Sequence, residues 1–304
     1  MPTKKRTKKT SVKGKERNSF RKNSKKIKLN QCSPRKNNET FTCFTRPSLK
    51  RIIKYWNEAN PHDQIEYTES DTRFQLWTKI NQRLAKICDN EYCWLEQPFI
   101  SNKSELTDDY RPKMPNNWKK NNREWLTTSD IEKVMNQYMD KYEDFFFVGA
   151  VPIDFDEKIG TGMCVVDELC RIKLENLLKR GITKIGIVFN LDPHDQPGSH
   201  WVSFYGNFTQ GKLYYFDSYG FKPPKEVKKL VNRLIEQGAK NNIKIDYEQN
   251  KVRHQFKESE CGIYSINFIE NMLEGKTFKS YCNSDINDDK MNRLRNKYYV
   301  KRFG

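Results

Sequence analysis

Four side chains between residues 200 and 261 have the types and the chain order that a thiol nucleophile requires. His200, Asp217, Gln255 and Cys261 follow one another along the chain. Acyl transfer at a cysteine needs a base, a group that orients the base, a donor for the oxyanion and the thiol itself. We therefore predict a cysteine hydrolase in which these four residues are, in order, the base, the orienting carboxylate, the oxyanion donor and the nucleophile.

His200 and Asp217 stand at the open end of a predicted β-hairpin. Apolar segments at 201–205 and 213–216 flank a turn at about 208–211. If the hairpin folds about the midpoint of residues 208 and 209, His200 lies directly opposite Asp217 on the same face. The carboxylate would then fix the tautomer of the imidazole and raise its basicity. A bulge would shift this register, and the alternative is a carboxylate that caps the strand beside an ordinary edge histidine.

Cys261 stands where an apolar segment with helical spacing begins. A sulfur at a helix N-terminus lies near the positive end of the helix dipole, which favours the thiolate. Gly262 beside it would let a substrate backbone approach closely. Gln255 lies in the loop that leads into this helix, so its amide and the Cys261 N–H could bind an oxyanion together. The alternatives are a buried structural thiol and a solvated loop amide.

The other histidines and the known short motifs offer weaker candidates. His254 adjoins Gln255 and could compete for the role of base, although the sequence shows no carboxylate partner for it. His194 lies in a turn-like stretch and could border the cleft as a loop residue. The sequence has no glycine-rich phosphate loop, zinc-protease helix motif or serine-nucleophile elbow. We expect neither a metal nor a cofactor.

The strongly basic charge of the chain belongs to its first 40 residues. Of the formal net charge of +17, residues 1–40 carry +13 and contain almost no apolar side chains. Such a segment buries too little surface to offset its ordering entropy, so we predict a disordered basic tail at 1–40. The tail could bind nucleic acid without sequence preference, act as a nuclear-import signal or only keep the protein soluble.

The eight cysteines do not resemble a disulfide framework. They are scattered through a chain of 304 residues that needs no covalent staples. The two close pairs, at 88/93 and 164/170, lack the spacing of a structural zinc site, and we interpret them as core or surface thiols. No apolar stretch reaches transmembrane length and no signal-peptide core is present. We expect a soluble protein in a reducing compartment that is not secreted.

Between the tail and the predicted hydrolase body we expect a small helical arm. Two segments with helical periodicity occupy about 47–60 and 74–87, and a polar stretch with prolines and asparagines at 101–122 is typical of a linker. We place the arm and linker at 41–120 and the body at 121–304. The arm could recognise substrate by itself or form only the first layer of a single domain.

The predicted body alternates strands and helices. We expect helices at about 125–142, 169–180, 227–237 and 261–273, and strands at about 145–148, 185–189 and 244–247 in addition to the hairpin. This order indicates an α/β or α+β body.

With these residues identified, the chain resembles the adenain/SUMO-protease superfamily of cysteine peptidases over about residues 123–275. The resemblance depends on His200 followed by Trp201, on Asp217 seventeen residues later, and on Gln255 six residues before Cys261. A Trp-Leu pair at 125–126 ahead of a helix is also similar to the superfamily. The segment 190–201 most resembles proteases of large DNA viruses, of the African swine fever virus and giant-virus type.

This resemblance implies an α+β core of papain-like type, with a mixed sheet flanked by helices and the nucleophile at a helix N-terminus. It further implies a cysteine endopeptidase that cleaves after Gly-Gly-type sites and matures viral structural polyproteins. Trp201, with Trp125, would help to form a narrow channel that binds the substrate. Such an enzyme would act in the virion, the host cytoplasm or a viral factory, or in the nucleus if the tail directs import.

Two other functions remain open at this point. An isopeptidase that removes ubiquitin-like modifiers such as SUMO from host proteins would use the same residues. A non-enzymatic structural protein that associates with nucleic acid would use mainly the basic tail, although the intact quartet of polar residues argues against it.

Overall fold

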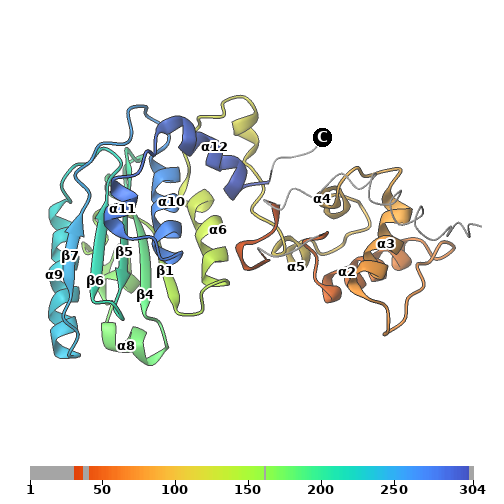
Figure 1. Ribbon diagram of the computed structural model, residues 1–304, viewed down its shortest axis with the longest axis horizontal. Helices are drawn as coiled ribbons and strands as arrows, with labels where there is room; N and C mark the ends of the chain where they lie inside the picture. The colour runs from red at the N-terminus through yellow and green to blue at the C-terminus, as the bar shows by residue number, and fades with distance from the viewer. Residues whose placement is uncertain (1–30, 37–40, 161, 301–304) are drawn as a thin grey trace, which may run out of the picture. The chain divides into compact units, whose positions relative to one another are not determined.

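The computed structural model describes residues 31–36, 41–160 and 162–300, which divide into two compact units. The smaller unit contains residues 41–109, and the larger one contains residues 32–36 and 110–300 (Figure 1). Apart from residues 31–36, the predicted basic tail lies outside the described residues. In the described part of the chain, no helix is both long enough and apolar enough to cross a membrane.

The smaller unit consists of helices α2 (Arg46–Ala59), α3 (Arg73–Leu84), α4 (Glu91–Leu95) and α5 (Ser104–Thr107). The two long helices occupy the predicted positions because each has an apolar stripe and a threonine cap at its start. Their stripes supply the core of the unit, with buried side chains at Leu49, Ile52, Ile53, Leu76, Ile80 and Leu84.

The expected linker at 101–122 is not a free connection. The boundary between the units lies between Asp109 and Tyr110, earlier than position 120, and the segment after it packs on the larger unit. The 3₁₀ helix at Asn116–Lys119 buries Trp118, whose ring centroid is 4.9 Å from that of Tyr299. The polar composition of the segment did not predict this packing, because it depends on a single aromatic side chain in the turn.

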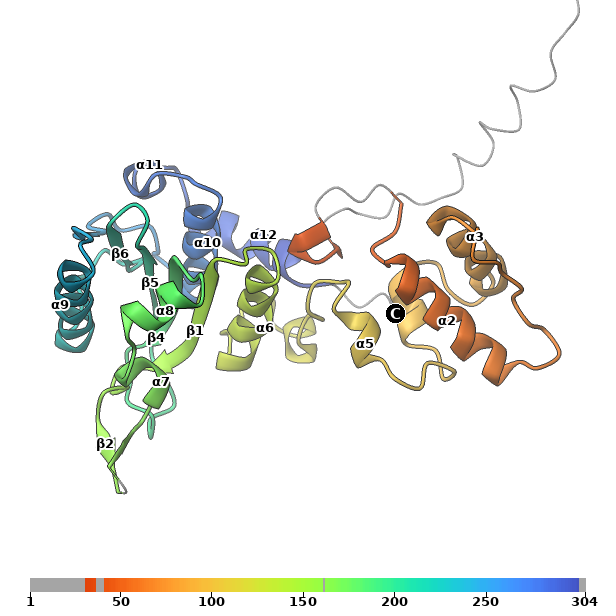
Figure 2. The same cartoon turned by 90° about the horizontal axis from the view of Figure 1, so that it is seen from below.

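A five-stranded mixed sheet forms the centre of the larger unit. Its strands are β1 (Phe145–Pro152), β4 (Lys184–Asn190), β5 (Trp201–Asn207), β6 (Lys212–Phe216) and β7 (Asp246–Gln249), in the order β1-β4-β5-β6-β7. β5 is antiparallel to both of its neighbours, whereas the outer pairs β1–β4 and β6–β7 are parallel. A small hairpin of β2 (Lys158–Ile159) and β3 (Met163–Cys164) stands apart from this sheet (Figure 2).

Helices cover both faces of the sheet. One face packs against α6 (Thr128–Met139), α10 (Cys261–Leu273), α11 (Phe278–Cys282) and α12 (Asp288–Tyr298), as Figure 1 shows. The other face packs against α7 (Asp167–Cys170), α8 (Leu174–Lys179) and α9 (Lys225–Lys240). The alternation of β4 explains the two cores, because Ile185 and Ile187 enter one of them and Val188 enters the other.

Two short helices replace the single helix predicted at 169–180. α7 ends at Cys170, and α8 begins at Leu174. The chain buries both Ile172 and Leu174 in the same core, and a continuous helix would point these two side chains in nearly opposite directions. The turn between α7 and α8 lets both side chains reach the core.

A buried cluster of polar groups fixes α10 between its neighbours. The carboxylate of Glu270 accepts hydrogen bonds from the hydroxyls of Tyr138 on α6 and Tyr298 on α12, and Lys297 Nζ lies 2.7 Å from it. Burial alone would raise the pKa of Glu270, but Lys297 and the two hydroxyls outweigh it and lower the pKa. The charged carboxylate thus ties the C-terminal part of α10 to α6 and α12.

Candidate active site

The structure brings His200 and Asp217 together as predicted, although the hairpin register differs. Ser203 pairs with Phe216 rather than with Tyr214, so the strands are shifted from the predicted register. The prediction of direct opposition is therefore wrong. Because the shift is by an even number of residues, both side chains stay on the same face, and His200 Nε2 lies 2.8 Å from Asp217 Oδ1.

The carboxylate of Asp217 is held in place on several sides. Asp217 is fully buried, and its Oδ1 also accepts the backbone N–H of Tyr219 at 2.8 Å. Its backbone carbonyl accepts Asn250 Nδ2 at 2.8 Å. These contacts fix the carboxylate before any substrate arrives, so the imidazole that it binds has a defined orientation.

Cys261 is the first residue of α10, as the sequence predicts. Glu260 precedes it as N-cap and makes no side-chain cap, so the first backbone N–H groups of the helix have no partner from that side chain. The carboxylate of Glu260 is fully buried and pairs instead with Arg123 Nη1 at 2.6 Å, while the other end of that guanidinium reaches Asp289 at 2.8 Å. This ion pair anchors the chain just before the thiol.

The imidazole of His200 is hydrogen-bonded to the carboxylate of Asp217, and Cys261 acts on its pKa. Burial opposes its positive charge, but hydrogen bonds to Asp217 and Cys261 and the charges of both groups outweigh burial and raise its pKa from 6.5 to about 9. Because Nε2 binds Asp217, the other ring nitrogen, Nδ1, is left for the sulfur. With this raised pKa, His200 holds its proton at neutral pH.

Gln255 is fully buried, and its amide is fixed at both ends. Its Oε1 accepts the hydroxyl of Ser218 at 2.6 Å, and its Nε2 donates to the carbonyl of Lys257 at 2.7 Å. For the second N–H of Nε2 the described residues show no hydrogen-bond partner. Ser218, the residue next to Asp217, therefore positions the amide of Gln255, the predicted oxyanion donor. The sequence analysis missed this contact although the Asp-Ser pair is visible in the chain.

Tyr219 is a second residue that the sequence analysis missed. Its ring stacks on the imidazole of His200 with centroids 4.6 Å apart, and its hydroxyl donates to the carbonyl of Lys257 at 3.3 Å. Burial and the nearby charge of Cys261 raise the pKa of its phenol. An aromatic residue two positions after the predicted carboxylate was the only signal in the sequence.

The predicted substrate-binding tryptophans have different surroundings. Trp201 is only 5% exposed and donates its indole N–H to the carbonyl of Leu126 at 2.9 Å, so most of its ring is packed in the core. A Cβ on Gly262 would lie 3.0 Å from Leu126 and 3.4 Å from Trp201, so this wall closes tightly around the residue after the thiol. Trp125 is 38% exposed and is the tryptophan that a ligand can reach.

The remaining histidines have other partners. His194 Nδ1 lies 2.6 Å from Asp154 Oδ2, and this hydrogen bond, only partly offset by desolvation, raises its pKa. The pair fixes the loop between β4 and β5 that leads to His200. The ring of His254 packs on Phe216, and burial lowers its pKa. No carboxylate of the described residues acts on it, so it lacks the support that a base needs.

The cysteine pairs differ from the expectation of free thiols. Disulfides join Cys88 with Cys93 and Cys164 with Cys170, so that expectation is wrong for these four residues. Their Cα atoms are 5.5 and 6.3 Å apart, within bridging distance. Among the described residues Cys261 and Cys282 are the free cysteines. No cluster of side chains in the described ranges has the composition of a metal site.

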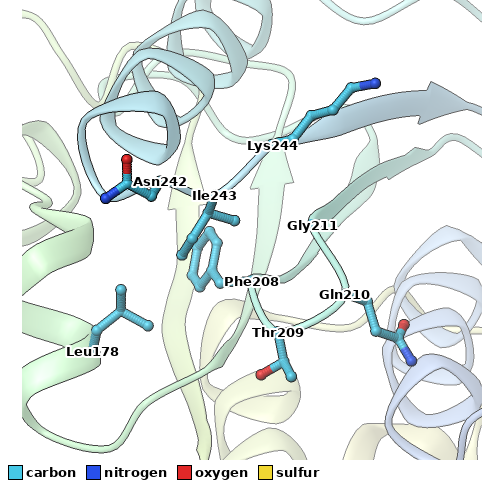
Figure 3. Close-up of a pocket in the computed structure, with 8 residues that line it drawn as sticks. All are labelled: Leu178, Phe208, Thr209, Gln210, Gly211, Asn242, Ile243 and Lys244. Carbon is cyan, nitrogen blue, oxygen red and sulfur yellow. The ribbon is translucent and has the colours of Figure 1, made fainter.

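A cavity of about 470 Å³ lies at the other end of the hairpin (Figure 3). The β5–β6 turn at 208–211 and the segment 242–244 line it together with Leu178. His200 precedes the first residue of β5 and Asp217 follows the last residue of β6, whereas this cavity borders the opposite ends of those strands. It is therefore separate from the thiol and the imidazole.

Comparison with known proteins agrees with this arrangement. The model of the Ulp1 protease family, C-terminal catalytic domain, matches residues 183–303. A thiol protease of Acanthamoeba polyphaga mimivirus is 32% identical over 292 residues, which are 89% of this chain and 93% of that protein. A cysteine protease of African swine fever virus is 27% identical over 73% of this chain and 86% of its own length.

A crystal structure of the African swine fever virus protease has the same fold, with a TM-score of 0.61 and 19% sequence identity. The match covers 90% of this chain and 96% of that one. This likeness confirms the predicted α+β fold. The family model and the match to the mimivirus thiol protease confirm the predicted enzyme class. The chain belongs to the Ulp1 protease family and is a cysteine protease.

Proposed function

We propose that the enzyme is an endopeptidase that cleaves after Gly-Gly-type sites by acyl transfer at Cys261. The observation that carries the proposal is the hydrogen bond of His200 to Asp217, with Cys261 at the start of α10 raising the pKa of the same imidazole. Cys261 attacks the scissile carbonyl, and His200, oriented by Asp217, gives its proton to the leaving amine. Gln255 and the Cys261 N–H stabilise the oxyanion.

The second half of the reaction uses the same groups. His200, now neutral, takes a proton from water, and the resulting hydroxide attacks the thioester. The tetrahedral intermediate expels the Cys261 thiolate and releases the carboxylic acid, and the proton restores the imidazolium. The reaction consumes one water molecule and returns Cys261 and His200 to their starting states, and no step of this mechanism uses a metal or a cofactor.

The Gly-Gly preference is supported by the closed wall on one side of the thiol. A methyl group at Gly262 would press on Leu126, 3.0 Å away, and would reach Trp201 at ordinary contact distance, 3.4 Å. A substrate residue that must lie beside this wall and Trp125 has little room for a side chain. Glycine, which has no side chain, fits there. The family resemblance favours the same sites in viral structural polyproteins, processed in the virion or in the host cytoplasm where particles assemble.

A competition experiment tests this proposal against modifier removal. Purified full-length enzyme is given a mixture of a Gly-Gly-X peptide and a SUMO- or ubiquitin-linked substrate, and both rates are measured. We expect faster turnover of the peptide, and no turnover by Cys261→Ala. Efficient cleavage of the modifier conjugate alone would contradict the polyprotein role and favour the isopeptidase, for which the SUMO protease names of some African swine fever virus relatives are the support.

We also propose that the basic segment 1–40 binds nucleic acid without sequence preference. Its charge of +13 supports a purely electrostatic contact. The logarithm of the association constant for duplex DNA should fall linearly with the logarithm of the salt concentration. Binding should disappear when residues 1–40 are deleted. Affinity that does not depend on salt would exclude this role. A purely structural, non-enzymatic protein is no longer a candidate, because the chain is a cysteine protease.

A further inference from the structure

Arg253 lies next to the ring stacked on the His200 imidazole, and its guanidinium makes no ion pair with any described residue. Its guanidinium carbon is 5.5 Å from the ring centroid of Tyr219 and 4.8 Å from that of Phe256. Tyr219 in turn stacks on His200 at 4.6 Å. Through these two contacts, the distance from the guanidinium to the imidazole is at most about the length of three extended residues.

The backbone that carries Arg253 is rigid although its side chain is exposed. The side chain of Asn250 bonds both the N–H and the carbonyl of Val252. The N–H of His254 donates to the carbonyl of Ser218 at 2.8 Å, and the N–H of Phe256 donates to Asp288 at 2.9 Å. Arg253 therefore presents its head from a fixed base, which reduces the entropy lost on binding a ligand.

The guanidinium has donors left for a ligand. Its Nε donates to the carbonyl of Gln255 at 2.9 Å, and no carboxylate among the described residues lies within ion-pair distance of it. Stacking on aromatic rings engages the faces of the guanidinium and leaves its N–H edges free. Free N–H edges of this kind match the geometry of a carboxylate.

The position of Arg253 assigns it to one side of the cleaved bond. The proposed acyl side runs along Trp125, Trp201 and the wall around Gly262. His200 must give its proton to the departing nitrogen, so the residues after the cleaved bond lie against the imidazole and the ring stacked on it. Phe221 and Phe256, 63% and 70% exposed, flank that same surface.

We propose that Arg253 is a specificity-determining residue, which binds an acidic side chain of the substrate within the first three residues after the cleaved bond. Tyr219 and Phe256 hold the guanidinium in place for this contact. The proposal rests on the function proposed above, and it adds a preference on the leaving-group side that the Gly-Gly preference does not contain.

The test uses peptides that share one acyl half ending in Gly-Gly. Glu, Gln or Lys is placed at one of the first three positions after the cleaved bond, and kcat/KM is measured for each peptide with the full-length enzyme. At one position we expect Glu to exceed Gln by about fivefold, the size of an exposed ion pair with good geometry. This ratio should fall as the ionic strength rises.

Three variants locate the effect. Arg253→Met keeps an apolar stem between the rings and should bring the Glu-to-Gln ratio to about one, and Arg253→Glu should favour Lys over Glu. Lys244→Glu makes the same charge change at the exposed side chain beside the distant cavity of Figure 3 and should keep the wild-type ratio. This control separates a local contact from the overall field of the protein.

The outcomes separate this proposal from the proposed function. An equal rate for Glu and Gln at all three positions would overturn the role of Arg253, as would a ratio that Arg253→Met leaves unchanged. A Gly-Gly coumarin amide has no residues after the cleaved bond, so its hydrolysis by the wild-type enzyme tests the proposed function alone. Failure to cleave both this amide and every Gly-Gly peptide would reject that function, whereas cleavage of all peptides at equal rates would reject only the role of Arg253.

Discussion

Replacing Asp217 with asparagine removes the charge behind the imidazole and keeps the shape of the side chain. In the wild-type enzyme Asp217 Oδ1 accepts from His200 and from the backbone N–H of Tyr219. An asparagine that keeps its oxygen on this backbone N–H loses the negative charge at the imidazole. The imidazolium form of His200 should therefore lose stability in Asp217→Asn while the fold is retained.

The size of this effect follows from the pKa of His200. Hydrogen bonds and charges raise it from 6.5 to about 9 although burial opposes them. One pKa unit corresponds to about 1.4 kcal/mol, so Asp217 and Cys261 together stabilise the imidazolium by about 3 kcal/mol net of burial. With only Cys261 left against the same burial, the pKa of His200 must fall and the imidazolium is lost at a lower pH.

The pH profile of kcat/KM measures this change. In the wild-type enzyme we expect the alkaline limb near pH 9, where His200 gives up its proton. In Asp217→Asn we expect that limb to move down by about one to two pH units, which by titration alone lowers the rate at pH 7.5 by up to about fourfold. A variant with an unchanged alkaline limb and an unchanged melting temperature would refute the role of Asp217.

Four further outcomes follow from the same contacts. Iodoacetamide should modify Cys261 much faster than Cys282, because burial raises the pKa of the Cys282 thiol to about 12, and comparable rates by peptide mass spectrometry would contradict this. Gln255→Ala should lower kcat about a hundredfold with little change in KM, and an equal rise in KM would point to substrate binding instead. Glu270→Ala should lower the free energy of unfolding by about 3 kcal/mol in urea titration, because Lys297 and two buried hydroxyls lose their acceptor. Because the folded-state pKa of His200 is raised, its interaction with Asp217 stabilises the fold fully below about pH 6.5, and this part of the free energy of unfolding should be lost as the pH rises through about 9. In His200→Ala the free energy of unfolding should lack this pH-dependent loss.

The parts of the site that local pattern determines could be predicted from the sequence. The apolar spacing after Cys261 gives α10 its observed start and end, and the two strands of the hairpin follow from their alternation. The register could not be predicted, because it depends on the conformation of the turn, in which Gly211 takes a φ of +61°. His200 still meets Asp217 because the shift preserves the face of each strand.

Contacts between distant segments were not predictable in the same way. Ser218 donates a hydrogen bond to Gln255, 37 positions later in the chain, and no local sequence pattern predicts that the two residues meet. The stacking of Tyr219 on His200 and the place of Arg253 depend on how the segments 217–220 and 250–257 pack together. Trp118 shows the same limit, since its burial reverses what the polar composition around it indicates.

Acylation of Cys261 requires His200 as the proton-transfer group. A peptide ending in Gly-Gly with a vinyl methyl ester in place of the cleaved bond captures the attacking thiolate, and mass spectrometry of the digested protein locates the adduct. We predict one adduct, on the peptide that contains Cys261, with strongly reduced labelling in His200→Ala. Labelling that spreads to Cys282, or that His200→Ala leaves unchanged, would contradict the assignment of nucleophile and base.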